Sequence, residues 1–91
     1  MTHKILNNPN LAVITSRNIL ENHSPILEAI HNTDGIWEFY GSESLNTADF
    51  RVVSLEEMVK LDVSINRILH IKEGYFAQRE NQESEWIINS I

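Results

Sequence analysis

Short runs of β-branched and aromatic residues mark most of the predicted strands. They cover residues 11–15, 36–40 and 50–53, followed by two later runs at 75–79 and 85–88. Polar residues 80–84 separate the last two runs, which is typical of an antiparallel hairpin. The run 26–30 fits a strand or a helix equally well by spacing alone.

Helical signals are concentrated in the middle of the chain. Ser54 and Glu57 fit a capping box, in which the Ser54 hydroxyl accepts a hydrogen bond from the amide of residue 57 and Glu57 reaches back. A helical apolar stripe follows: Leu55, Met58, Val59 and Leu61. Asp62 can cap a second short helix, and Ser16 a brief turn. We predict an α+β fold, a small antiparallel sheet with two or three short helices packed on one face.

Alternation along residues 36–40 assigns side chains to the two faces of a strand. Trp37 and Phe39 lie on one face, and Ile36, Glu38 and Tyr40 on the other. Five aromatic residues in predicted strands are expected in the core: Trp37, Phe39, Phe50, Phe76 and Trp86. Tyr40 and Tyr75 are expected at a rim, with the hydroxyl in water.

Length and composition indicate a single folded unit. The chain has 91 residues, 42% of them hydrophobic, which predicts one domain over 11–91 after a loose lead-in at 1–10. Cysteine is absent, and the opening residues do not resemble a secretion signal. No apolar run approaches the length of a membrane span. We therefore expect a cytoplasmic protein without a membrane partner.

A formal net charge of −6 narrows the classes of partner. Nucleic-acid affinity depends largely on Lys and Arg displacing counterions, so DNA and RNA are disfavoured. A basic protein would be attracted and steered by the same field. The alternative interpretation is that the charge only keeps a small domain in solution.

The residues predict no metal, cofactor or nucleophile site. The four histidines lack the i, i+3 or i, i+4 spacing of helical metal ligands: His3, His23, His31 and His70. Serine does not occur in a Gly-x-Ser-x-Gly elbow, and the three glycines are too far apart for a phosphate loop. The chain is therefore not expected to be an enzyme.

One catalytic alternative stays open. Four carboxylates fall in a single segment, from which two could converge as an acid/base pair: Asp34, Glu38, Glu43 and Asp49. Glu43 with His31 is a second version of the same hypothesis. The competing interpretation places all of these carboxylates in solvent at strand ends and loops.

A family resemblance covers residues 12–86. It is carried by ordered short motifs: Val13-Ile-Thr15, Pro25-Ile26, Asp34-Gly-Ile-Trp37, Gly41-Ser-Glu43, Leu61-Asp-Val-Ser-Ile65, Ile68-Leu69, Gly74, Phe76 and Arg79. With these motifs the chain resembles a family of small bacterial immunity proteins of polymorphic toxin systems, formerly a domain of unknown function. The chain departs from the family pattern at Gly35, two residues before Trp37, and at Val63, where the family tends to carry proline.

The resemblance implies an α+β fold, a strand at 26–30 and a non-catalytic role in sequestering a cognate toxin protein. Many toxin domains are basic because they attack nucleic acid, which suits an acidic partner. The expected partner-binding residues are Tyr40, Glu43 and Asp49, together with Glu38 if its strand face is open. Trp37 is expected as buried support beneath them. A further alternative is a structural or regulatory module, a monomer or weak homodimer that pairs through an edge strand.

Overall fold

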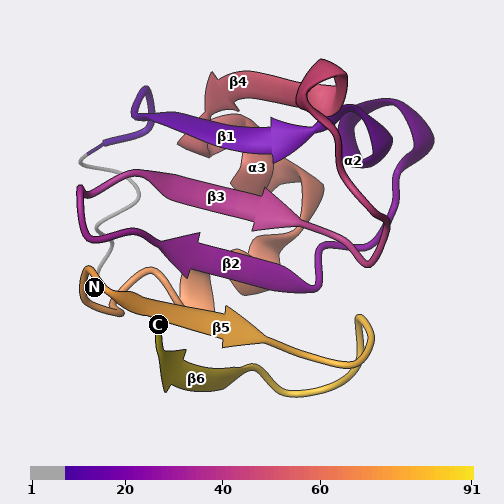
Figure 1. Ribbon diagram of the computed structural model, residues 1–91. Coiled ribbons are helices and arrows are strands. Elements are labelled where there is room, and N and C mark those ends of the chain that lie inside the picture. Colours follow the sequence, from indigo (N-terminus) through magenta and orange to yellow (C-terminus); the bar gives the residue numbers. More distant parts are fainter. Residues whose placement is uncertain (1–7) are drawn as a thin grey trace.

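A six-stranded sheet in the order β4-β1-β3-β2-β5-β6 forms the centre of the computed structural model, which describes residues 8–91 (Figure 1). The strands are β1 (Ala12–Ser16), β2 (Glu28–His31), β3 (Trp37–Tyr40), β4 (Phe50–Ser54), β5 (Tyr75–Gln78) and β6 (Ile87–Ser90). All five predicted strand regions are present, and the ambiguous run 26–30 overlaps β2. The second strand of the predicted hairpin lies two residues later than expected.

One pair of strands corrects the prediction of an antiparallel sheet. β1 and β3 are parallel, whereas the other four pairs are antiparallel. The reason is that β2 runs in the direction opposite to β1. β3 folds back from β2 through a turn and inserts between β2 and β1, so it runs in the same direction as β1. The sheet is mixed, and the α+β class is confirmed.

The helices begin where capping side chains satisfy their free amides. In α2 (Arg17–Asn22) the Ser16 side chain accepts a hydrogen bond from the Ile19 amide. Both hydrogen bonds of the predicted capping box are present at the start of α3 (Leu55–Leu61). Asp62 caps η2 (Val63–Arg67), which is a 3-10 helix, and a shorter one, η1 (Thr47–Asp49), precedes β4.

The helical segments α3 and η2 cover one face of the sheet (Figure 1). Their buried side chains pack against the inward-facing strand residues in one cluster: Val13, Ile19, Ile26, Ala29, Trp37, Phe39, Leu55, Met58, Ile65, Ile68, Ile71 and Ala77. The core prediction for Trp37 and Phe39 is confirmed. The prediction for Phe50 is wrong, because its side chain is 43% exposed. Phe76 and Trp86 are half-buried.

Part of the predicted lead-in 1–10, residues 1–7, lies outside the described residues. The next residues are tied to α3, since the Pro9 carbonyl accepts from the Glu56 amide at 3.0 Å and the Leu11 carbonyl from the Leu55 amide at 2.8 Å. Between residues 8 and 91, no helix has the length and apolar content needed to cross a membrane.

Candidate functional site: the open face of the sheet

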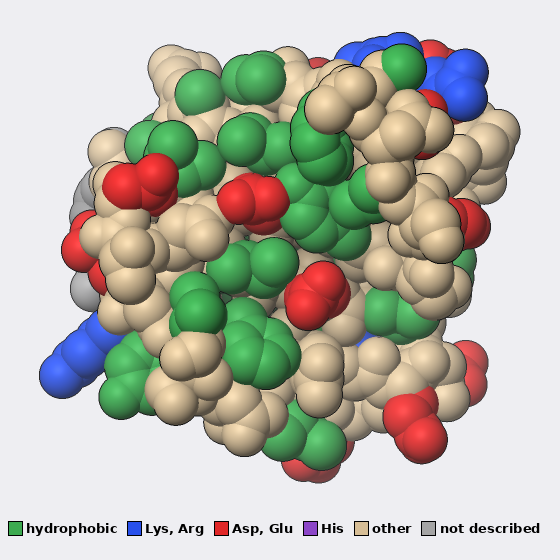
Figure 2. Space-filling view, viewed as in Figure 1, with side chains coloured by type: hydrophobic (Ala, Val, Ile, Leu, Met, Phe, Trp, Pro, Cys, Tyr) green, Lys and Arg blue, Asp and Glu red, His purple; other side chains and the backbone are tan. Residues whose placement is uncertain are grey.

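The face of the sheet opposite α3 and η2 has no helix over it within residues 8–91 (Figure 1). We call it the open face. Strand pairing places the following side chains on it: Ile14, Glu28, Ile30, Glu38, Tyr40, Phe50, Val52, Phe76, Gln78, Ile87 and Asn89. Figure 2 shows acidic side chains surrounded by hydrophobic ones over the middle of the sheet. A half-apolar, uncovered sheet face is typical of a binding surface.

A hydrogen-bonded carboxylate lies at the centre of the open face. The Tyr40 hydroxyl donates to Oε1 of Glu38, and the Asn32 side-chain amide donates to its Oε2. Both Glu38 and Tyr40 are on β3, two residues apart, so strand alternation brings them to the same face as predicted. The two contacts fix the carboxylate in place and leave it partly exposed.

Burial raises the pKa of the Tyr40 hydroxyl well above its usual range. The hydrogen bond to Glu38 and the negative charges of Glu38 and Glu28 act in the same direction, because each disfavours a phenolate. The prediction that the Tyr40 hydroxyl lies in water at a rim is wrong, because the residue is 6% exposed and the hydroxyl is a neutral donor to Glu38.

Exposed apolar side chains flank this polar centre. Val52 is 69% exposed and Phe50 43% exposed on edge strand β4. The Phe50 ring lies 6.0 Å from that of Tyr40, which extends the aromatic surface toward this edge. Ile30 and Phe76, which are cross-strand partners on β2 and β5, are half-buried on the other side of Glu38. The result is a central carboxylate within an apolar surround.

The other two predicted binding residues lie away from this centre. Glu43 is in the loop after β3, where its Oε2 accepts from the Ser24 hydroxyl at 3.0 Å. A side chain at Gly41 would come within 2.9 Å of the Pro25 carbonyl, so glycine permits this close approach. Asp49 is 9% exposed and forms an ion pair with Arg17 at 3.3 Å, which leaves it little free surface.

The residues of the catalytic alternative are dispersed over the fold. His31 lies on the covered side, stacked on Trp37 with ring centroids 4.2 Å apart, and its Nδ1 contacts the Ile71 carbonyl. That is the opposite end of the β2–β3 pair from Glu43. Asp34 accepts a hydrogen bond from the Ile36 amide in the β2–β3 turn. In the described part of the chain, no group of three or more His, Asp or Glu residues is arranged to hold a metal ion.

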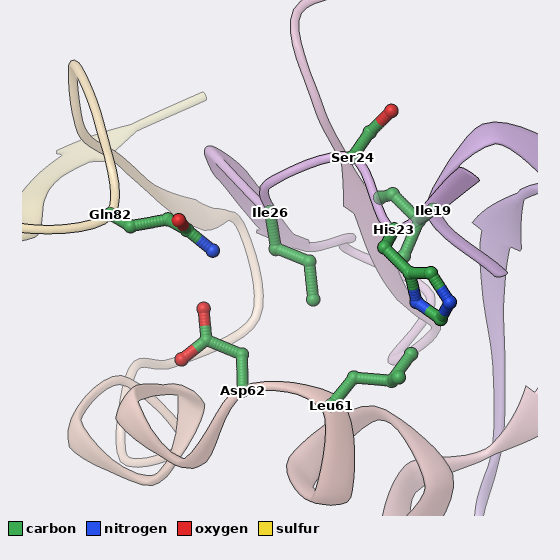
Figure 3. A pocket seen from close by; sticks show the side chains of 7 residues that line it. All are labelled: Ile19, His23, Ser24, Ile26, Leu61, Asp62 and Gln82. Carbon is green, nitrogen blue, oxygen red and sulfur yellow. The ribbon is translucent and has the colours of Figure 1, made fainter.

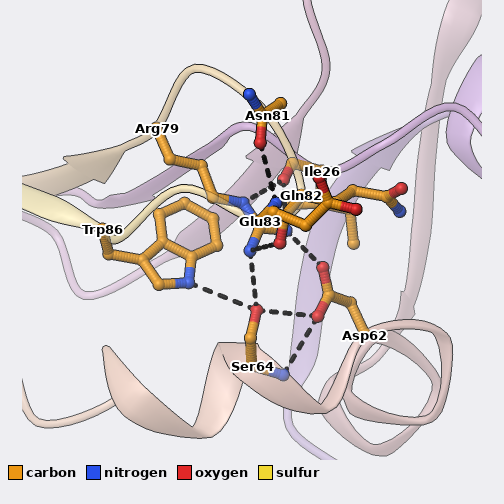
Figure 4. A network of polar contacts seen from close by, with 8 residues as sticks. All are labelled: Ile26, Asp62, Ser64, Arg79, Asn81, Gln82, Glu83 and Trp86. Atoms are coloured by element: carbon orange, nitrogen blue, oxygen red, sulfur yellow. Dashed lines mark hydrogen bonds and ion pairs between the residues drawn. The ribbon is translucent and has the colours of Figure 1, made fainter.

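The covered side contains a second charged centre, the Arg79 network (Figure 4). The Arg79 guanidinium donates to the Ile26 carbonyl through Nε and Nη2 and forms an ion pair with Asp62. Its Nη1 donates to the Ser64 hydroxyl at 3.0 Å, and its Cζ lies over the Trp86 ring, 4.2 Å from the ring centroid. These contacts use the guanidinium within the fold, so the network is structural.

A small pocket of about 150 Å³ lies beside this network (Figure 3). It is lined by Ile19, His23, Ser24, Ile26, Leu61, Asp62 and Gln82. The Asp62 carboxylate is its main ionic group, and it is already bound to Arg79 and Ser64. The pocket therefore offers a ligand little unsatisfied polar chemistry.

Residues next to the Glu38–Tyr40 pair were not identified from the sequence as site residues, among them Glu28, Asn32 and Phe50. Glu28 belongs to the run whose helix and strand assignments fitted equally well, so its face was not assigned. The Phe50 side chain was expected in the core. The strand that the resemblance implies at 26–30 places Glu28 and Ile30 together, opposite Ala29, but spacing alone did not.

Comparisons with known proteins do not identify a family, since no family model, curated protein or solved structure matches the chain. The resemblance to immunity proteins stays a prediction from the residues quoted above.

Proposed function

We propose that this protein is an immunity protein, which neutralises a cognate bacterial toxin by binding it directly through the open face. The observation that carries the proposal is the Glu38–Tyr40 pair at the centre of an uncovered, partly apolar sheet face. The family resemblance supplies the class of partner. The proposed setting is the bacterial cytoplasm, where the toxin would be met before it acts.

Apolar area and a fixed charge make different contributions to such an interface. Exposed Phe50 and Val52 would supply hydrophobic contact area at the edge of the patch. Glu38 is held by two donors before any partner arrives, so little side-chain entropy is lost when a partner cation binds it. This pre-organisation favours a partner that presents a Lys or Arg among apolar residues.

The net charge supports a basic toxin as the partner. A charge of −6 raises the association rate with a cationic surface, and added salt would reduce that rate. Glu28 adds a second negative charge on the open face, next to Tyr40 across the β2–β3 pair. Nucleic acid and membrane surfaces are not part of the proposal.

Coexpression with the products of neighbouring genes tests the proposal, using purified complexes and growth protection against the toxin as readouts. Glu38→Lys reverses the central charge and is expected to weaken toxin binding by about 100-fold or more, because a close interfacial charge pair becomes a repulsion. Growth protection should be lost with it. Higher salt should weaken binding of the parent protein.

Glu21→Lys is the matched control, since it makes the same change of charge at an exposed position on α2, away from the open face. It should retain binding and protection. If both variants bind the toxin as well as the parent, the open face is not the binding surface. If no neighbouring product is toxic or binds, the immunity proposal fails.

A further inference from the structure

Strand β6 is an uncovered edge of the sheet. It pairs with β5 on one side, and within residues 8–91 the strand order ends there. All four of its residues are exposed. Natural edge strands are commonly protected by charges, proline or a bulge, because free backbone groups can pair with another strand. Residues 86–91 contain neither a charged residue nor a proline.

The hydrogen-bonding pattern shows which backbone groups of β6 face outward. The Ile91 amide donates to the Gly74 carbonyl at 2.9 Å, so residue 91 points its backbone groups toward β5. Hydrogen-bonded pairs alternate along an antiparallel ladder. Ile87 and Asn89 therefore also face β5, whereas Ile88 and Ser90 present their amides and carbonyls to the outside.

From these outward-facing backbone groups of Ile88 and Ser90 we infer that two copies of the chain pair through β6, antiparallel about a twofold axis. With Asn89 opposite Asn89 of the second copy, the outward groups of Ile88 meet those of Ser90 of the second copy. An Ile88–Ser90 pair can form two hydrogen bonds, and the twofold axis generates a second, equivalent pair. The two six-stranded sheets then become continuous.

The same register brings exposed apolar side chains together. Ile87 lies opposite Ile91 of the second copy, on the same face as Asn89. They form a non-hydrogen-bonded pair, the type in which side chains are closest. In the single chain Ile87 is 61% exposed and Ile91 67% exposed. The pairing therefore covers two of the most exposed isoleucines at each end of the interface.

The side-chain pattern of β6 selects a second copy as the occupant of this edge. In the antiparallel register Ile87 meets Ile91 and Asn89 meets Asn89, and residues 86–91 have no charged side chain that would add to the repulsion between two copies of net charge −6. The antiparallel pairing is also self-complementary, as a twofold interface requires. The Glu38–Tyr40 centre of the open face remains free in each copy, so this inference does not depend on toxin binding.

Analytical ultracentrifugation over a concentration range up to the millimolar tests the pairing with the intact chain. We expect a concentration-dependent monomer–dimer equilibrium. Ser90→Pro removes an outward amide without removing a bond to β5 and should suppress dimerisation. The double variant Ile87→Lys with Ile91→Lys should raise the dimer dissociation constant by about tenfold or more, because like charges face each other at two places.

A charge swap tests the register. Combining Ile87→Lys with Ile91→Glu places opposite charges at the same two contacts and should restore the dimer relative to the double lysine variant. Val63→Lys is the control at a 72% exposed apolar position on η2, and it should leave the equilibrium unchanged. Circular dichroism reports whether each variant is folded. A parent that stays monomeric at every concentration, or a dimer that responds equally to both double variants, would overturn the inference.

Discussion

The two faces of the sheet each hold a hydrogen-bonded ionic group, and they differ in how completely its contacts come from within the chain. On the covered side, the Arg79 side chain is 2% exposed and bonded to carbonyl, hydroxyl and carboxylate groups of the same chain. On the open face, Glu38 has two intramolecular donors but remains partly exposed, surrounded by apolar side chains.

This difference separates a structural charge from an available one. A buried charge must have its hydrogen bonds satisfied internally, because solvent cannot reach it. A half-exposed carboxylate held in a fixed position can still accept a bond from a partner. The Arg79 network therefore joins segments of the fold, whereas Glu38 is suited to bind an external cation.

The largest expected change in stability comes from replacing one phenylalanine on each face of the sheet. Phe39 is fully buried on the covered side and Phe50 is 43% exposed on the open face. Phe39→Ala should lower the free energy of unfolding by about 3–5 kcal/mol, because it leaves a cavity in the core. Phe50→Ala should cost about 1 kcal/mol or less. Urea denaturation measures both, and equal losses would show that the open face is part of the stabilising core.

A smaller loss of unfolding free energy is expected when residue 79 keeps its positive charge but loses the planar guanidinium. Arg79→Lys can retain the ion pair with Asp62, but one ammonium group cannot replace the fork that binds Ile26 and Ser64. We expect a loss of about 2 kcal/mol in urea denaturation, since buried acceptors lose their donors. Arg67→Lys at an exposed site on η2 is the control and should be close to neutral.

The smallest change in the free energy of unfolding is expected for a substitution at Tyr40. Tyr40→Phe removes the hydroxyl that donates to Glu38 and should cost about 1 kcal/mol at neutral pH. Because folding raises the pKa of Tyr40, its neutral form is favoured in the folded state. The stabilisation is complete below the unfolded pKa of about 10 and declines as pH rises through the folded pKa.

The stability difference between the parent and Tyr40→Phe should therefore narrow at alkaline pH. Urea denaturation at neutral pH and above the unfolded tyrosine pKa provides the measurement. A stability difference that stays constant or widens would mean that folding does not raise the pKa of Tyr40. Far-UV circular dichroism must show that both proteins are folded at the higher pH.

Local elements were predictable because their signals lie within a few residues. The Ser54–Glu57 capping box sets the start of α3 through hydrogen bonds three residues apart. Alternation along β3 correctly put Trp37 and Phe39 on one face and Glu38 and Tyr40 on the other. The parallel β1–β3 pair was not predicted, because insertion of β3 beside β1 depends on tertiary packing that local patterns do not encode.

Only part of the candidate site was predictable for the same reason. Glu38 and Tyr40 share one strand, so their proximity follows from its period. Asn32 reaches Glu38 across the β2–β3 turn, and Glu28 becomes a neighbour only when β2 pairs with β3. The ion pair between Asp49 and Arg17 joins residues whose separation in sequence gives no hint of contact.

The insertion of β3 between β2 and β1 also bears on the order of folding. The hydrogen bond from Asn32 to Glu38 closes a segment of six residues, whereas that from Thr15 to the Phe39 carbonyl closes one of 24. Loop-closure entropy makes the longer closure costlier by about 1.2 kcal/mol, two doublings of loop length. The β2–β3 hairpin is thus the less costly closure, and we expect β1, although first in the chain, to dock onto an edge that later residues have already built.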